Sequence, residues 1–255
     1  MTLAHQAPVP PVQTALHRLA PEVKVAAVGV FVISVALVPR GVWWPFAIDL
    51  AVLAVLAVWA RAPLSLLAKR LLVELPFVLF VVLLPFVSKA PYVHVLGVRL
   101  SQPGLTLAGS IVCKATLAVL ATGVLAATTT PAAIVAGLGR LRVPAVITGV
   151  AALALRYVQL AWEDVGRARR ARLARGDDPR WLWQARATAR GVGGLAARSL
   201  ARGERVHSAM LARGFDGRVP VIALSPAATA YAWVAAAAVV LPALAATVLT
   251  IGGMH

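Results

Sequence analysis

Cysteine is almost absent from the chain, which has a single thiol, Cys113, among 255 residues. One cysteine excludes an internal disulfide and any metal site built from several thiols. Histidine, aspartate and glutamate form no clustered set of metal ligands either, so the sequence predicts no resident metal. Because Cys113 stands in an apolar run, we expect its side chain to be buried as packing.

Lysine is also scarce, and the residue before each lysine excludes a phosphate-binding loop. A Gly-Lys-Ser/Thr core requires a preceding glycine, but the four lysines follow Val, Ala, Ser and Cys. These lysines are Lys24, Lys69, Lys89 and Lys114. The HExxH and GxSxG patterns of hydrolases are missing as well. We therefore predict a non-catalytic chain without a cofactor, in which any energy must come from another subunit.

Acidic residues are few, and so are charged residues altogether. The chain has 9 Asp and Glu against 25 Lys and Arg, with 13% charged and 60% hydrophobic residues and a mean hydropathy of +0.84. A soluble domain usually carries about 25% charged residues. The composition therefore predicts a multi-pass membrane protein. The net charge of +16 is uneven, because residues 140–218 hold 16 basic and 6 acidic residues, a net of +10.

Five apolar stretches are expected to be membrane-spanning helices, with extended ends or tilt where needed. They comprise residues 23–38, 46–60, 71–87, 105–127 and 226–251. Residues 1–22 lack the apolar core of a signal peptide and are expected to form a cytoplasmic lead. Trp43 and Trp44 are typical of a membrane interface. Residues 88–103 are expected to form an outer loop.

Three charged residues fall inside or next to these apolar stretches. An ionisable group within a bilayer is costly and is a functional candidate by default. Asp49, near the start of the second stretch, is expected either at the interface or as such a candidate. Glu74 is expected to pair with Lys69 or Arg70 rather than to bind substrate. Lys114 must find a partner, water or an end of the bilayer, and a structural or assembly contact is expected.

The distribution of basic residues predicts the orientation, because Lys and Arg near helix ends favour the cytoplasmic side. If the N-terminus is inside, the outer loops carry only Arg40, Lys89 and Arg99. The block at 140–218 then lies on the inner side with most other basic residues. The sequence therefore predicts a cytoplasmic basic block and an external C-terminus.

Residues 153–217 form a basic, alanine-rich segment in which one pattern occurs twice. Residues 167–178 match residues 205–216 at an offset of 38, including an Ala-Arg-Gly tripeptide in each copy. The two tripeptides are Ala174, Arg175, Gly176 and Ala212, Arg213, Gly214. Glycine is the usual residue just past a helix end, so two helices are predicted to end here. The same tripeptide at 189–191 and 201–203 is expected inside the second helix.

Arg175 and Arg213 are thus expected in the last turns of two helices, where the helix dipole favours a cation. A guanidinium there is suited to bidentate bonds with a carboxylate or a carbonyl-rich groove on another protein. A basic block could instead bind nucleic acid or anionic lipid. Against nucleic acid, the segment lacks a recognised binding fold and carries an apolar stripe at helical spacing. Some arginines are expected to contact lipid head groups in any case.

Several short motifs are distributed over most of the chain. They are Pro21-x-x-Lys24, Lys114 in its apolar run, Thr128–Thr130, residues 138–144, Arg156-Tyr157, the segment from Arg167 to Gly176, and Glu204–Asp216. With these motifs the chain resembles the transmembrane T component of energy-coupling factor (ECF) transporters, in its CbiQ-like branch. The resemblance implies an all-α integral membrane protein with about five transmembrane helices and long cytoplasmic coupling helices inserted before the last span.

The resemblance also implies an organisation and a set of partners. The expected segments are a lead at 1–22, a four-span domain at 23–130, a coupling region at 131–218, and a final span and C-terminus at 219–255. The two Ala-Arg-Gly tripeptides at the helix ends would dock into two ATP-binding cassette ATPase subunits, with support from Arg167, Glu204 and Arg205. The other partners would be the bilayer of a prokaryotic cell membrane and a CbiM-like substrate-binding S component, with or without a small CbiN-like subunit.

The cargo implied by the resemblance is Co²⁺, which a separate subunit would bind. A T component for nickel or vitamins, and a basic membrane scaffold without transport, remain alternatives, because the sequence of this chain does not define the cargo.

Overall fold

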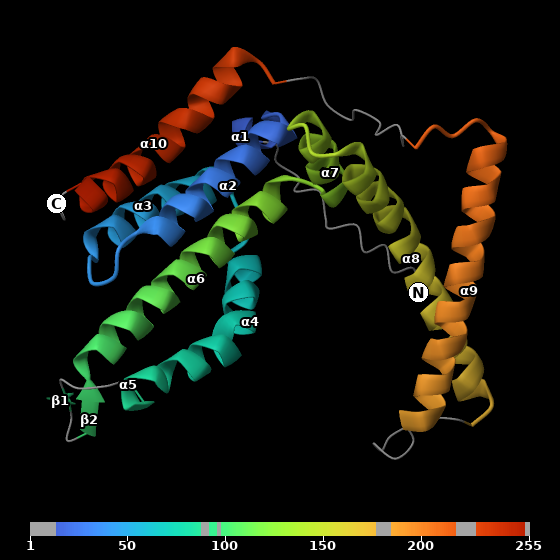
Figure 1. The fold of residues 1–255 in the computed structure, drawn as a ribbon, viewed down its shortest axis with the longest axis horizontal. Coiled ribbons are helices and arrows are strands. Elements are labelled where there is room, and N and C mark those ends of the chain that lie inside the picture. Colours follow the sequence, from blue (N-terminus) through green and yellow to red (C-terminus); the bar gives the residue numbers. More distant parts are fainter. Residues whose placement is uncertain (1–13, 88–91, 96–97, 177–184, 218–227, 253–255) are drawn as a thin grey trace. The chain divides into compact units, whose positions relative to one another are not determined.

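The computed structural model describes residues 14–87, 92–95, 98–176, 185–217 and 228–252, and this part is almost entirely helical (Figure 1). The chain divides into two compact units. The first unit is Met1–Leu141 with Ala223–His255, and the second is Arg142–Ile222.

The first unit is a helical bundle with one small strand pair. Its helices are α1 (Ala15–Arg18), α2 (Pro21–Leu37), α3 (Trp44–Trp59), α4 (Leu64–Val82), α5 (Leu84–Val87), α6 (Gln102–Thr128), α7 (Pro131–Arg140) and α10 (Ala230–Gly252). The strands β1 (Tyr92–Val95) and β2 (Val98–Ser101) pair antiparallel between α5 and α6. The two strands lie within the segment 88–103 that was expected to form an outer loop, and they were not predicted from the sequence.

Proline and hydroxyl side chains set the starts of several helices. Pro21 stands at the first position of α2, where its missing N–H is not needed. The Ser101 hydroxyl accepts a hydrogen bond from the Gly104 amide at 3.3 Å and begins α6. The Thr130 hydroxyl accepts one from the Ala133 amide, also at 3.3 Å, and begins α7. Thr130, the last residue of the Thr128–Thr130 motif, is therefore the N-cap of α7, directly before Pro131.

Helices α2, α3, α6 and α10 share an apolar core. Its buried residues are Phe31, Val35, Val38, Phe46, Leu53, Leu117, Ala121 and Ala243. The small side chains of Ala121 and Ala243, 1% and 0% exposed, allow close approach of helix backbones in such a bundle. Cys113 packs against this core, as predicted, although its side chain is partly rather than fully buried.

Charged side chains connect the helix ends of the first unit. The Arg140 guanidinium, in the last turn of α7, donates to the Glu22 carboxylate in the first turn of α2 at 3.1 Å. The Ala228 amide, just before α10, donates to the same carboxylate at 2.8 Å. The Lys24 ammonium donates to the Thr128 carbonyl, the last of α6, at 3.1 Å. Because terminal helix groups lack intrahelical partners, these bonds stabilise the junctions between helices.

Among the described helices, three are long and apolar enough to cross a membrane: α6, α10 and α8 (Ala145–Ala174). Helix α3 is apolar but has 16 residues, which gives about 24 Å against a hydrocarbon core of about 30 Å. Helix α4 contains three charged residues. The fold is that of an α-helical multi-pass membrane protein, and the count of five spans stays a prediction. Helix α8 was expected outside the bilayer, but it is one of the three helices that could cross a membrane because its first half is apolar.

The third apolar stretch, expected at 71–87, is divided into two helices. Helix α4 begins earlier, at Leu64, and contains Pro76 in its interior. It ends at Val82, and the short α5 follows with Pro85 in its first turn. Pro85 has no N–H to donate to a carbonyl one turn earlier, which removes one helical hydrogen bond next to the break, whereas α4 continues through Pro76 despite the same loss.

The second unit is a helical hairpin formed by α8 and α9 (Ala185–Ala212), which run in opposite directions (Figure 1). It contains most of the region expected to couple. Helix α7, which the sequence assigned to that region, belongs to the first unit.

Candidate functional site

The end of α8 has the geometry that its Ala-Arg-Gly tripeptide predicted. The helix ends at Ala174, and Arg175 is its C-cap. Gly176 follows with a φ of +76°, the left-handed conformation that favours glycine. Its amide donates to the Leu173 carbonyl at 3.0 Å, which satisfies one of the terminal carbonyls of the helix.

The end of α9 repeats this geometry 38 residues later. Gly214 has a φ of +81°, and its amide donates to the Leu211 carbonyl at 3.0 Å. The Phe215 amide donates to the Met210 carbonyl at 3.0 Å, which completes a Schellman motif. The two predicted helix ends are therefore confirmed. The tripeptides at 189–191 and 201–203 lie inside α9, also as predicted.

Both terminal arginines are presented to the surroundings. Arg175 and Arg213 are exposed, as are the alanine and glycine on either side of each. Neither guanidinium has a hydrogen bond or an ion pair with any residue in the described part of the chain. Each helix end of the second unit thus presents a planar cation with five N–H donors, none of which is bonded within the described residues.

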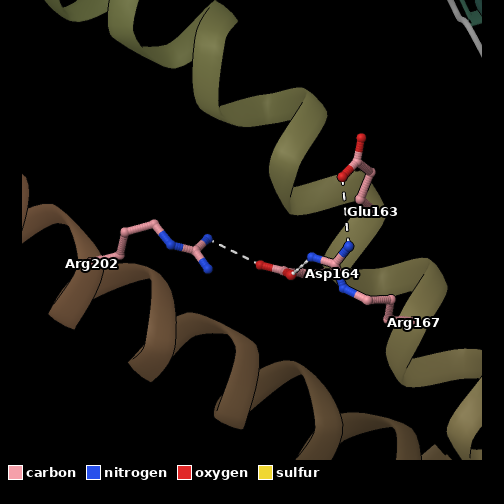
Figure 2. Close-up of polar contacts among 4 residues, drawn as sticks. All are labelled: Glu163, Asp164, Arg167 and Arg202. Atoms are coloured by element: carbon pink, nitrogen blue, oxygen red, sulfur yellow. Dashed lines mark hydrogen bonds and ion pairs between the residues drawn. The ribbon is translucent and has the colours of Figure 1, made fainter.

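A charged cluster joins the two helices away from these ends (Figure 2). The Asp164 carboxylate on α8 accepts from the Arg202 guanidinium on α9, with 3.0 Å between Oδ2 and Nη1. Its other oxygen, Oδ1, accepts from Arg167, three residues further along α8. Arg167 also lies 3.6 Å from a carboxylate oxygen of Glu163, in the preceding turn. One carboxylate therefore binds two guanidiniums, one from each helix.

The three residues expected to support coupling have different surroundings. Arg167 belongs to the cluster just described. Glu204 and Arg205 are exposed on α9, and neither has an ion pair within the described residues. Arg167 and Arg205 occupy equivalent positions of the repeat. Arg167 bonds to Asp164, which also bonds to Arg202 on α9, whereas Arg205 has no ion pair within the described residues.

The surroundings of Asp49 and Glu74 come from the packing of the bundle. Asp49, for which an interfacial position and an intramembrane functional role were both left open, is 0% exposed in the bundle, and neither carboxylate oxygen has a hydrogen-bond partner among the described residues. Glu74 accepts from the Thr116 hydroxyl at 3.2 Å instead of pairing with Lys69 or Arg70. In both cases the packing of the bundle, rather than neighbouring charges in the sequence, decides the surroundings.

Lys114 makes the structural contact that was expected for it. Its ammonium donates to the Ala36 and Val38 carbonyls, both at 2.8 Å, at the end of α2. Those carbonyls lack partners within α2, so the lysine stabilises that helix end.

The sequence is similar to those of known transport proteins. A family model described as the cobalt transport protein CbiQ matches residues 13–223, which include both exposed helix ends. The chain belongs to the CbiQ cobalt transport protein family. A curated relative, the cobalt transport protein CbiQ of Rhodobacter capsulatus, is 31% identical over 185 residues, 71% of this chain and 73% of the relative. As a CbiQ family member, the chain is a multi-pass membrane component of a transporter.

The contact between Asp164 and Arg202 was not predicted, although the sequence contains an indication of it. The repeat offset of 38, extended towards the N-terminus, pairs Asp164 with Arg202. Opposite charges at equivalent positions of a repeat can meet where two copies cross. For Arg202 the sequence predicted only a position inside the second helix.

Proposed function

We propose that this CbiQ family member is the T component of an ECF-type importer, which transmits ATP-driven motion from two ATPase subunits to a substrate-binding membrane subunit. The observation that carries the proposal is the pair of equivalent helix ends in the second unit. Each end stops at a left-handed glycine and presents an exposed arginine without a partner among the described residues.

The chemistry of these ends supports docking to another protein. A guanidinium forms two parallel hydrogen bonds with a carboxylate, which fixes orientation as well as affinity. A helix that ends directly behind the arginine gives it a rigid support, so movement of the bound partner is passed to the helix. Two equal ends suit two copies of one subunit, or two similar subunits, because each copy can bind the same local structure.

The cargo we propose is Co²⁺, because the family model and the curated relative are both named for cobalt transport. A CbiM-like S component would bind the ion, with or without a small CbiN-like subunit, and this chain would not need to ligate it. A T component for nickel or vitamins is the second candidate. A basic membrane scaffold without transport is the third.

The test of this proposal is coexpression of the chain with its ATPase and S-component candidates. We expect one complex to be isolated from the membrane and, after reconstitution, to take up cobalt in an ATP-dependent way. Nickel and a panel of vitamins serve as competing cargoes. Uptake of a vitamin without cobalt would contradict the cargo, and a stable complex without any uptake would favour the scaffold.

We also propose that the N-terminus and the second unit are cytoplasmic and the C-terminus external, in a prokaryotic cell membrane. The support is the excess of Lys and Arg at the predicted inner ends. A reporter fused after Gly176 should stay in the cytoplasm, and one fused to the C-terminus should be exported. Both reporters on the same side of the membrane would contradict this orientation.

A further inference from the structure

The ion pair between α8 and α9 lies at the same distance from both exposed helix ends. Asp164 precedes Arg175 by 11 residues, and Arg202 precedes Arg213 by 11 residues. At 1.5 Å per residue, each arginine is about 16 Å from the ion pair along its own helix. Helices α8 and α9 run in opposite directions (Figure 1). The helix end next to Arg175 and the helix end next to Arg213 therefore lie on opposite sides of the ion pair.

The surroundings of the ion pair distinguish it from an ordinary surface contact. The Asp164 side chain is 17% exposed, and that of Arg202 is 35% exposed, against 54% for Arg167. Both oxygens of Asp164 are bonded, one to each arginine, so the carboxylate has a defined orientation (Figure 2). Several charges in one network contribute more than an isolated exposed pair does.

Side-chain packing constrains the helix crossing weakly on one side. A groove of about 500 Å³ separates α8 and α9 next to the ion pair, and its lining includes Tyr157, Ala161, Gly203, His207 and Met210. Side chains that line an open groove do not pack against the facing helix there, so they constrain the angle between the two helices less than a filled interface would. An ion pair at the crossing therefore contributes more to fixing the angle between α8 and α9 than it would if side chains filled the groove.

We propose that the Asp164–Arg202 ion pair is the pivot of the hairpin: it holds the crossing point of α8 and α9 midway between Arg175 and Arg213. Changes of the crossing angle then move the two arginines by equal amounts. Asp164 and Arg202 are positioning residues in this proposal, and Arg167 orients the carboxylate. The proposal rests on the proposed function for its role in transport, and on the geometry alone for its effect on the hairpin.

The experiment measures the distance between two spin labels by pulsed electron paramagnetic resonance, on the full chain in lipid nanodiscs without ATPase subunits. Cys113 is replaced by alanine, and the labels are attached at L173C and L211C, which are equivalent in the repeat and exposed by 43% and 53%. We expect one narrow distance peak for the parent. D164N and R202Q should each lose that narrow peak, because either change removes one charge of the same ion pair.

Matched controls come from neighbouring residues of the same chemistry. Glu163 contacts Arg167 within α8, and Arg198 is exposed one turn before Arg202, so E163Q and R198Q should keep the narrow peak. The D164N/R202Q double variant should be no broader than either single variant. An unchanged peak in D164N, or broadening in the double variant equal to the sum of both single effects, would overturn the pivot.

A second measurement separates this proposal from the proposed function. In the assembled transporter, D164N should keep both ATPase subunits bound, because Arg175 and Arg213 are intact, while cobalt uptake per ATP hydrolysed falls. D164E keeps the charge, so it should recover part of the cobalt uptake per ATP hydrolysed that D164N loses. If the parent binds no ATPase at all, the proposed function fails while the distance result still decides the pivot. Full coupling in D164N would overturn the role of the pivot in transport.

Discussion

Arg202 and Arg213 each stand between an alanine and a glycine, yet their guanidiniums have different surroundings. Arg213 follows the last residue of the helix and is exposed without a partner in the described residues. Arg202 lies inside the helix and bonds to Asp164. An Arg-to-Ala change at 202 would leave a partly buried carboxylate with one donor fewer, a cost that is absent at 213. Arg202 is therefore unsuitable as a neutral control for docking.

Asp49 offers a test of the membrane bundle at the scale of one residue. A buried carboxylate without a partner is costly, and the amide of asparagine removes the charge at nearly constant volume. We expect D49N to insert normally and to raise the unfolding temperature in detergent, by an amount corresponding to about 1–3 kcal/mol. Glu74, which has the Thr116 hydroxyl as donor, supplies the matched control, and E74Q should not stabilise. A lower unfolding temperature for D49N would show that its carboxylate has a stabilising partner.

At the scale of helices, the local motifs were predictable and the pairings were not. The ends of α8 and α9 follow from a glycine after an alanine-rich run, and the start of α7 follows from Thr130 before a proline. Helix caps depend on only a few neighbouring residues, so they can be recognised in the sequence. The β1–β2 hairpin was missed because each strand has four residues, too few for alternation to be distinguished from a loop.

The helix ends allow a test in which one substitution has opposite effects at two places. Gly214 and Gly203 each follow Ala-Arg, and an added Cβ would meet nothing within 4 Å at either. Gly214 has a positive φ, so G214A should destabilise the end of α9 by about 1–2 kcal/mol. Gly203 is inside the helix, so G203A should stabilise it by about 0.5–1 kcal/mol. Hydrogen exchange of amides in residues 205–217 measures both effects, and the same sign at both positions would contradict the assigned helix end.

At the scale of the whole molecule, composition predicted a helical membrane protein, and the family match agrees with it. The burial of Asp49 and the contact between Asp164 and Arg202 depend on side chains brought together by folding. The exposed ends were predictable because each depends on a few neighbouring residues, whereas the repeat indicates the ion pair only once the two helices are known to cross at these positions.

The proposed docking of the second unit predicts how much ATPase binding is lost when either terminal arginine is replaced. If each helix end binds an ATPase groove, R175A or R213A removes a charge-assisted contact and leaves the helix propensity almost unchanged. The expected loss at each position is about 2–4 kcal/mol, or roughly 30- to 900-fold in Kd. Lysine should recover part of the binding, because it keeps the charge but lacks the planar fork.

The most direct test is retention of the ATPase subunits by chain variants purified at equal membrane expression, with cobalt uptake recorded in parallel. R175A and R213A should each weaken retention, and the double variant should lose the ATPase subunits while remaining inserted in the membrane. R198A, which removes an exposed arginine from the interior of α9, should retain them like the parent. Equal losses for R175A, R213A and R198A would mean that the second unit acts through diffuse positive charge, and would contradict docking by the two helix ends.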